Sequence, residues 1–199
     1  MLIDIRADQV PATFGAAGVT YFPRYAGSRL HAPTAGFLAT VGLPSGKLFS
    51  TKVDLGEYEE PAAPDRLSPG LSCRPSLQAA FDAEGAALPE EAASWEILGE
   101  FQYATVALDP ASGKVYSFAE GEEFPVPMHA DVSSLVHALI VVETGVAELR
   151  ELPHRDDLAR AAAVEELRAR ITRVDETPFA SEDGAWSAFF EELALGMWG

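Results

Sequence analysis

The chain has little of what marks secreted or membrane proteins. Its 199 residues include a single cysteine, Cys73, so no disulfide can form within it. The stretch Met1–Arg6 contains too short an apolar run for a signal peptide. No apolar run approaches the ~20 residues of a membrane span. We therefore expect a soluble protein of the reducing cytoplasm, with no membrane partner.

Basic side chains are also scarce. The chain carries 14 Lys and Arg residues against 31 Asp and Glu residues, a formal net charge of −17. The imbalance is uneven, because residues 1–52 carry five basic and two acidic side chains and all the net negative charge lies after them. Binding to nucleic-acid phosphates needs a basic footprint, so we expect no nucleic-acid partner. An acidic surface attracts a basic partner, although plain solubility explains the same charge.

Motifs for catalysis, cofactors and metals are missing. The segment Gly42–Leu48 is one residue shorter than a phosphate loop, and Leu48 replaces the Ser or Thr that would hold magnesium. No two of the four histidines are four residues apart, and none joins Cys73 in a zinc-ligand pattern. We expect no catalytic residue, no cofactor and no metal. An enzyme that uses Cys73 as a nucleophile, or an acidic cluster, is kept as a minor alternative.

The segment Trp95–Phe118 has the pattern of a short strand followed by a tight hairpin. Residues of Ala104–Leu108 and Lys114–Phe118 alternate as in half-buried strands. Asp109–Gly113 between them has turn chemistry, because proline presets φ and glycine accepts a positive φ. An isolated hairpin is marginally stable in water, so it needs a cover, for which Val132–Leu149 is the obvious candidate.

The alternation also predicts which side chains share a face of the hairpin. In the first strand Val106 and Leu108 face one way. In the returning strand Tyr116 and Phe118 lie on one face, and Val115 on the other.

Helices are predicted on both sides of this hairpin. Early in the chain the pattern predicts a helix at about 33–41. After the hairpin it predicts one capped by Asp131, one at about 156–174 with Leu158 and Val174 on its buried stripe, and one from about 183 whose apolar face includes Met197. Helices that follow strands instead of alternating with them indicate an α+β fold. We expect one domain, residues 1–199, with a long Pro-rich loop at about 56–75.

Acidic residues form two clusters that could contact a partner. One consists of Glu57, Glu59 and Glu60, and the other of Glu120, Glu122 and Glu123. Both are predicted in loops without a nearby histidine, so solvated charge is the commoner explanation, docking of a basic partner the next, and catalysis the last. Of the three tryptophans, Trp95 and Trp186 are predicted in the core and Trp198 at the surface.

Several segments, in their order along the chain, resemble the fourth subfamily of the SUKH superfamily. The matching segments are F-L-A-T-V-G-L-P at 37–44, I-L-G at 97–99, V-A-L-D at 106–109 with G-K-V at 113–115, S-S-L-V-H-A-L at 133–139 and W-S-A-F-F-E-E-L at 186–193. The chain departs from the family pattern at Val132, where asparagine is common, and at Leu139, where an aromatic residue is common. The resemblance extends over about 150 residues.

That resemblance implies a central antiparallel β-sheet flanked by helices and a non-enzymatic role. It implies a bacterial immunity protein that neutralises a cognate toxin of a polymorphic toxin system, a toxin that is often a nuclease or a nucleic-acid deaminase. The expected partner is this protein toxin, basic in character, and a monomer is favoured. The family offers no catalytic residues to carry over. The alternative is a regulatory or scaffold module of the same fold that binds other proteins.

Overall fold

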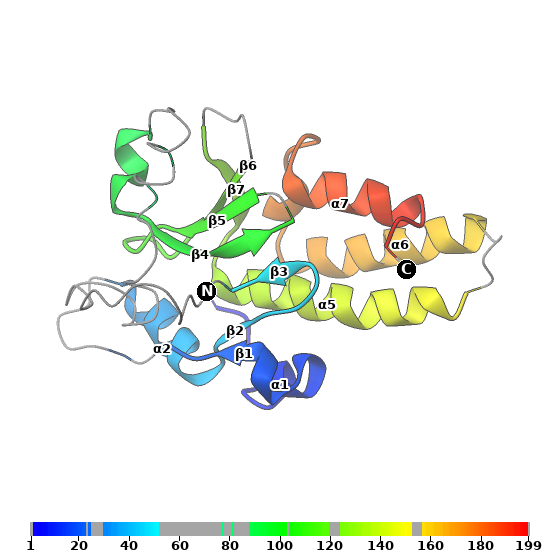
Figure 1. Ribbon diagram of the computed structural model, residues 1–199, viewed down its shortest axis with the longest axis horizontal. Coiled ribbons are helices and arrows are strands. Elements are labelled where there is room, and N and C mark those ends of the chain that lie inside the picture. The colour runs from blue at the N-terminus through cyan, green and yellow to red at the C-terminus, as the bar shows by residue number, and fades with distance from the viewer. Residues whose placement is uncertain are drawn as a thin grey trace.

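A computed structural model describes residues 2–22, 24, 30–51, 77, 81, 88–102, 104–119, 124–152 and 157–198. The six glutamates of the acidic clusters, Cys73 and the expected Pro-rich loop lie outside these residues. The described part has the α+β architecture that the order of helices and strands predicts, with helices packed around a five-stranded antiparallel sheet (Figure 1).

The main sheet follows the chain without a crossover. Each strand pairs with the next in sequence, and all pairs are antiparallel. Its strands are β3 (Phe49–Ser50), β4 (Glu96–Phe101), β5 (Ala104–Leu108), β6 (Val115–Ala119) and β7 (Val126–His129). A smaller sheet pairs β1 (Val19–Thr20) with β2 (Leu43–Pro44).

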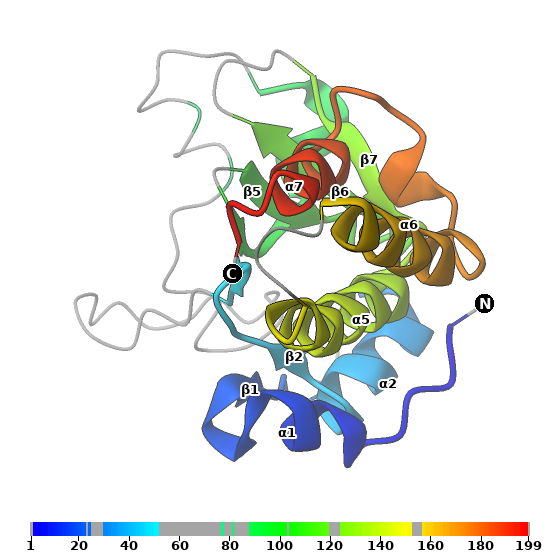
Figure 2. The same cartoon turned by 90° about the vertical axis from the view of Figure 1, so that its right-hand side faces the viewer.

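The longest helix lies at the centre of the molecule. Figure 2 shows it between the N-terminal layer on one side and the last two helices, backed by the main sheet, on the other. The helices are α1 (Gln9–Phe14), α2 (Ala32–Thr40), the central α5 (Val132–Arg150), α6 (Asp157–Thr172) and α7 (Ala185–Ala194), with 3₁₀ turns η1 (Ala16–Gly18), η2 (Glu90–Ser94) and η3 (Thr177–Phe179).

The hairpin of β5 and β6 has the two faces that alternation predicts. Val106, Leu108 and Val115 belong to the main core, whereas Tyr116 and Phe118 lie in a second cluster on the opposite face of the sheet. Trp95, which precedes β4, stacks on Tyr116 with ring centroids 4.0 Å apart. Both faces of the hairpin are therefore covered by other side chains. An isolated hairpin in water lacks this cover and is only marginally stable.

The hairpin turn also contacts α2. The backbone N–H of His31 donates to the carbonyl oxygen of Pro110 at 2.7 Å, immediately before α2 begins. Turn chemistry within Asp109–Gly113 was enough to predict the loop, but no local pattern indicates this contact with a segment far back in the chain.

Helix α5 is buried on more than the single stripe that its periodicity predicts. Twelve of its 19 residues are buried, because helices pack against it from several sides. By length and mean hydropathy (1.5), α5 alone among the helices of the described segments could cross a membrane, contrary to the expectation that no run is long enough. However, 67% of the apolar window is buried within the protein, as in the core helix of a water-soluble domain.

Gly145 explains how closely α5 and α6 approach. A Cβ atom at this position would lie 2.3 Å from Cδ2 of Leu167 on α6. The sequence alone identifies Gly145 only as a residue that weakens a helix. In the structure its missing side chain makes room for a buried leucine of the neighbouring helix.

Three large apolar side chains of the predicted stripes are exposed instead of buried. Leu158 on α6 is 86% exposed and Val174, just beyond α6, is 44% exposed, so the predicted stripe is wrong at both ends. Helix α7 ends at Ala194, and Met197, predicted on its apolar face, is 67% exposed. Periodicity cannot indicate these outcomes, because it does not show where a neighbouring element stops covering a helix.

Candidate functional site

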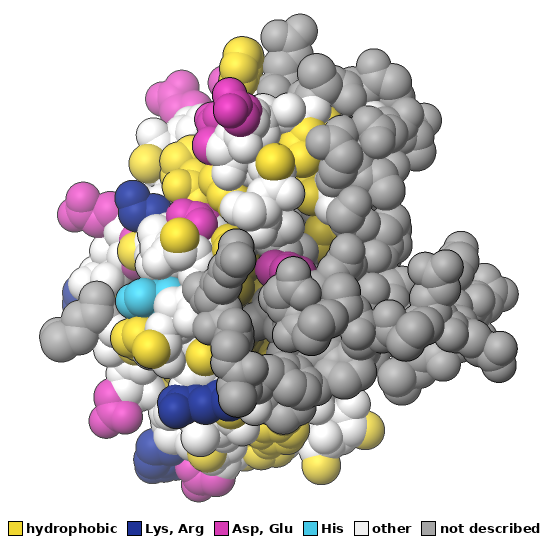
Figure 3. All heavy atoms as spheres, turned by 90° about the vertical axis from the view of Figure 1, so that its left-hand side faces the viewer, with side chains coloured by type: hydrophobic (Ala, Val, Ile, Leu, Met, Phe, Trp, Pro, Cys, Tyr) yellow, Lys and Arg dark blue, Asp and Glu magenta, His cyan; other side chains and the backbone are white. Residues whose placement is uncertain are grey.

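The predicted acidic clusters lie outside the described residues. The two candidate sites that follow are formed by described residues. Figure 3 shows acidic side chains of the described residues spread over one face, among apolar, polar and basic ones. Two features of the described residues have the chemistry of a site. One is a buried polar network around His129, and the other is a groove beside the segment that follows α7.

The buried network has the residue types of a hydrolase triad. Ser134 Oγ lies 2.8 Å from His129 Nδ1, and Oδ2 of Asp175 lies 3.5 Å from the same nitrogen. On the other side of the ring, the indole N–H of Trp186 donates to His129 Nε2 at 2.7 Å. We call these four side chains the His129 network.

The hydrogen-bond directions of the His129 network rule out triad chemistry. An indole N–H only donates, so Nε2 accepts and the proton of the neutral ring is on Nδ1. That proton points to Ser134, whose hydroxyl donates to Asp175. A triad needs the serine and the acid on opposite ring nitrogens, with the serine accessible to substrate. Here both are on one nitrogen, and His129 and Ser134 are buried.

The His129 network instead fixes the start of α5. Asp131 caps the helix as predicted, because its carboxylate accepts from the backbone N–H groups of Ser133 and Ser134. Asp175 accepts from the backbone N–H of Ala130 at 2.9 Å. Through His129 and Trp186 the same network reaches β7 and α7. Its partners are far apart in the chain, so the sequence gives no signal for it.

Burial and hydrogen bonding set the charge states of the network. Burial lowers the pKa of His129 below its ordinary value, despite the nearby Asp175 carboxylate. Burial opposes ionisation of Asp175, but hydrogen bonds from His129, Ser134, Thr177 and Ala130 outweigh it and hold the pKa of Asp175 well below its usual range. On α5, burial also lowers the pKa of His137.

No metal or phosphate site occurs among the residues that the structure describes. They contain no group of three or more His, Cys, Asp or Glu side chains that could hold a metal ion. The Gly42–Leu48 segment is followed by strand β3, whereas a phosphate loop leads into a helix whose N-terminus faces the phosphate. Lys47 is exposed on this segment.

The second candidate begins where α7 ends. Gly196 has φ of 76°, a conformation that glycine adopts without strain. The N–H groups of Gly196 and Met197 donate to the carbonyl oxygens of Leu193 and Glu192, at 3.1 and 3.0 Å. This pair of bonds is a Schellman motif, which ends a helix and reverses the chain.

Trp198 anchors the reversed segment against the body of the protein. Its indole N–H donates to Glu192 Oε2 at 2.7 Å, and the same oxygen accepts from the Gln102 side chain at 3.3 Å. The indole ring packs edge-on against Phe189, with centroids 5.4 Å apart. Trp198 is thus half-buried, more than its predicted surface position implies.

A groove of about 210 Å³ lies between α5, the segment before β3 and this reversed segment, and we call it the C-terminal groove. Its lining combines apolar side chains with two cations and one carboxylate. The lining residues are Lys47, Leu48, Val142, Glu143, Val146, Ala147, Arg150, Phe189, Met197 and Trp198. Leu195, two residues before Met197, is 77% exposed.

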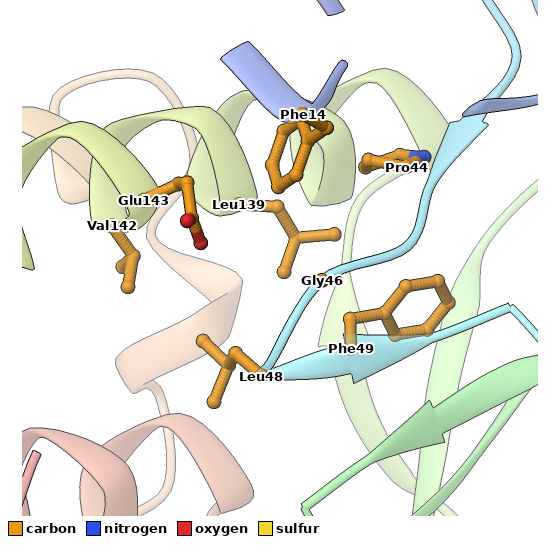
Figure 4. A pocket seen from close by; sticks show the side chains of 8 residues that line it. All are labelled: Phe14, Pro44, Gly46, Leu48, Phe49, Leu139, Val142 and Glu143. Atoms are coloured by element: carbon orange, nitrogen blue, oxygen red, sulfur yellow. The ribbon is translucent and has the colours of Figure 1, made fainter. Parts of the chain in front are cut away.

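A small hollow adjoins the C-terminal groove. Its volume is about 10 Å³, and it shares Leu48, Val142 and Glu143 with the groove. Figure 4 shows Phe14 and Leu139 facing this hollow from α1 and α5. The described residues that line the groove and hollow include no nucleophile with an adjacent base. Apolar side chains with a few charged groups are typical of the lining of binding pockets.

The whole chain was also compared with known proteins. A family model described as SUKH-4 immunity protein matches residues 5–192. No curated protein matches the chain, and no solved structure does. The matched range begins before α1 and ends within α7, so it includes both sheets and the central helix.

The pKa shifts predict a stability that falls on mild acidification. His129 and His137 have lower pKa values folded than unfolded, so the folded state binds fewer protons. Their contribution is complete above the unfolded pKa of about 6.5. Below it, the fully buried His129 loses up to about 1.4 kcal/mol per pH unit, and the half-buried His137 loses less because solvent screens it. Asp175, whose folded pKa is also lowered, adds a further loss below about pH 4.

Urea unfolding of the protein from pH 8 to pH 5 measures this loss. The fall of the unfolding free energy with falling pH should be smaller in His129→Gln and in His137→Gln than in wild type. It should be unchanged in the control His31→Gln. A wild-type unfolding free energy that is constant over this range would contradict the neutral, buried state of His129.

Proposed function

Because the chain belongs to the SUKH-4 immunity protein family, we propose that it binds and neutralises a cognate protein toxin of a bacterial polymorphic toxin system. The family match over residues 5–192 carries this proposal. The toxin acts on nucleic acid, as a nuclease or a deaminase. The protein is a stoichiometric binder in the cytoplasm and has no catalytic activity of its own.

The charge of the chain supports a toxin of this kind. Enzymes that act on nucleic acid present basic clefts to phosphate backbones. A protein with a net charge of −17 attracts such a cleft over a long range and can occupy it in place of phosphate. The described residues supply no reactive constellation that would favour an enzyme, since the His129 network is buried and fully hydrogen-bonded.

The two acidic clusters are the part of the chain that we propose to steer this encounter. Glu57, Glu59 and Glu60 lie close together in sequence, as do Glu120, Glu122 and Glu123. Clustered like charges add their potentials, so they raise the association rate with an oppositely charged surface more than dispersed charges do.

Co-expression tests the proposed function. A strain that makes the toxin encoded beside this gene should stop growing, and the protein should restore growth. An unrelated acidic protein of similar size is the control, because it tests whether charge alone protects. If the protein binds no neighbouring gene product and restores no growth, the regulatory or scaffold module becomes the better account.

Association kinetics test the acidic clusters. Replacing all six glutamates by glutamine should lower the association rate with the toxin by about tenfold at low salt, and should weaken its salt dependence. The matched control makes the same change at six exposed glutamates elsewhere: Glu90, Glu91, Glu165, Glu166, Glu176 and Glu182. Equal association rates for the two variants at every salt concentration would show that the clusters contribute no more to toxin association than other exposed glutamates do.

A further inference from the structure

The C-terminal groove differs in charge from the chain as a whole. Lys47 and Arg150 line it together with one carboxylate, Glu143, so its lining is net positive in a chain of net charge −17. Neither cation forms an ion pair with any residue that the structure describes. Two cations beside one concave surface, without an ion-pair partner among the described residues, are a local site for an anion.

The rest of the groove is apolar in a way that suits a buried contact. Val142 and Val146 line it from α5, and Phe189 from α7. Met197 lies at its edge with 67% of its surface exposed. Methionine and tryptophan are enriched at the centres of protein interfaces, where an apolar anchor enters a preformed pocket.

The groove is held open by contacts that do not depend on a partner. The Schellman motif at Gly196 and the hydrogen bond from Trp198 to Glu192 place the segment that forms one of its walls. A preformed pocket loses little conformational entropy when it is filled, which favours affinity.

We propose that the C-terminal groove binds a segment of the toxin in which a large apolar side chain stands beside a carboxylate. The apolar side chain packs on Val146, Met197 and Trp198, and the carboxylate lies near Lys47 and Arg150. A second copy of this chain is the poorer occupant, because two molecules of charge −17 repel each other. The inference rests on the proposed function and names the chemistry of its partner.

The proposal separates two roles of charge. The overall negative charge attracts a basic toxin from a distance, whereas the groove accepts an acidic residue that the remaining surface would repel. This local positive charge gives specificity. The overall negative charge attracts any basic protein, but a basic protein that lacks the acidic anchor does not bind in the groove.

Affinity measurements with matched variants test the groove. Met197→Asp, and separately the pair Lys47→Glu with Arg150→Glu, should each raise the Kd for the neighbouring toxin by about tenfold or more. Leu158→Asp is the control for the first, since Leu158 is an exposed leucine on α6 outside the groove. Lys114→Glu with Arg173→Glu, two exposed cations outside the groove, is the control for the second.

Overlapping short peptides from the toxin identify the anchor. The peptides that bind wild-type protein should contain a large apolar residue next to Asp or Glu, and should not bind Met197→Asp. Unchanged thermal unfolding of each variant would show that the folded state is intact. Every variant, including the pair at Lys47 and Arg150, can also be compared by a second readout, the toxin's residual activity.

The outcomes distinguish this inference from the function on which it rests. If wild-type protein neutralises the toxin and the groove variants do so with unchanged Kd, the groove is not the anchor, although the proposed function stands. If bound peptides contain no carboxylate, the proposed ligand chemistry is wrong. If wild-type protein binds no toxin, the proposed function fails and this inference fails with it.

Discussion

The burial of α5 is the constraint on which the rest of the structure depends. This helix supplies side chains to the main core and also lines the C-terminal groove. Each large apolar side chain buried along it contributes about 1.5–3 kcal/mol. A helix so enclosed must have its N-terminal polar groups satisfied inside the protein, since each unpaired one costs about 1–3 kcal/mol. Asp131 and the His129 network meet that requirement, and they join α5 to β7 and α7.

Local chemistry made part of the fold predictable. The hairpin faces, the cap at Asp131 and the α+β order follow from alternation, turn residues and helix periodicity, all of which act within a few residues. The His129 network could not be predicted, because Trp186 and His129 are 57 residues apart. The position of Leu158 could not be predicted either, since its exposure depends on where neighbouring elements end.

The candidate site was predictable to a smaller extent. The sequence predicted a surface position for Trp198, which is half-buried in the structure. The groove beside it depends on the chain reversal at Gly196 and the hydrogen bond to Glu192, which no periodicity indicates. The acidic clusters at Glu57–Glu60 and Glu120–Glu123 remain predictions from composition. In our proposal the acidic charge and the groove act together, with long-range attraction and a short-range anchor supplied by different parts of the chain.

The central claim is that the protein neutralises its toxin by occupying it, and titration of toxin activity tests this most directly. A fixed amount of toxin would be mixed with increasing protein, and residual activity measured after different incubation times. A stoichiometric binder predicts a linear fall that ends near one equivalent and does not change with time. Complete loss of activity at a small fraction of an equivalent, progressing with time, would contradict the account, because only a catalyst could inactivate many toxin molecules in turn.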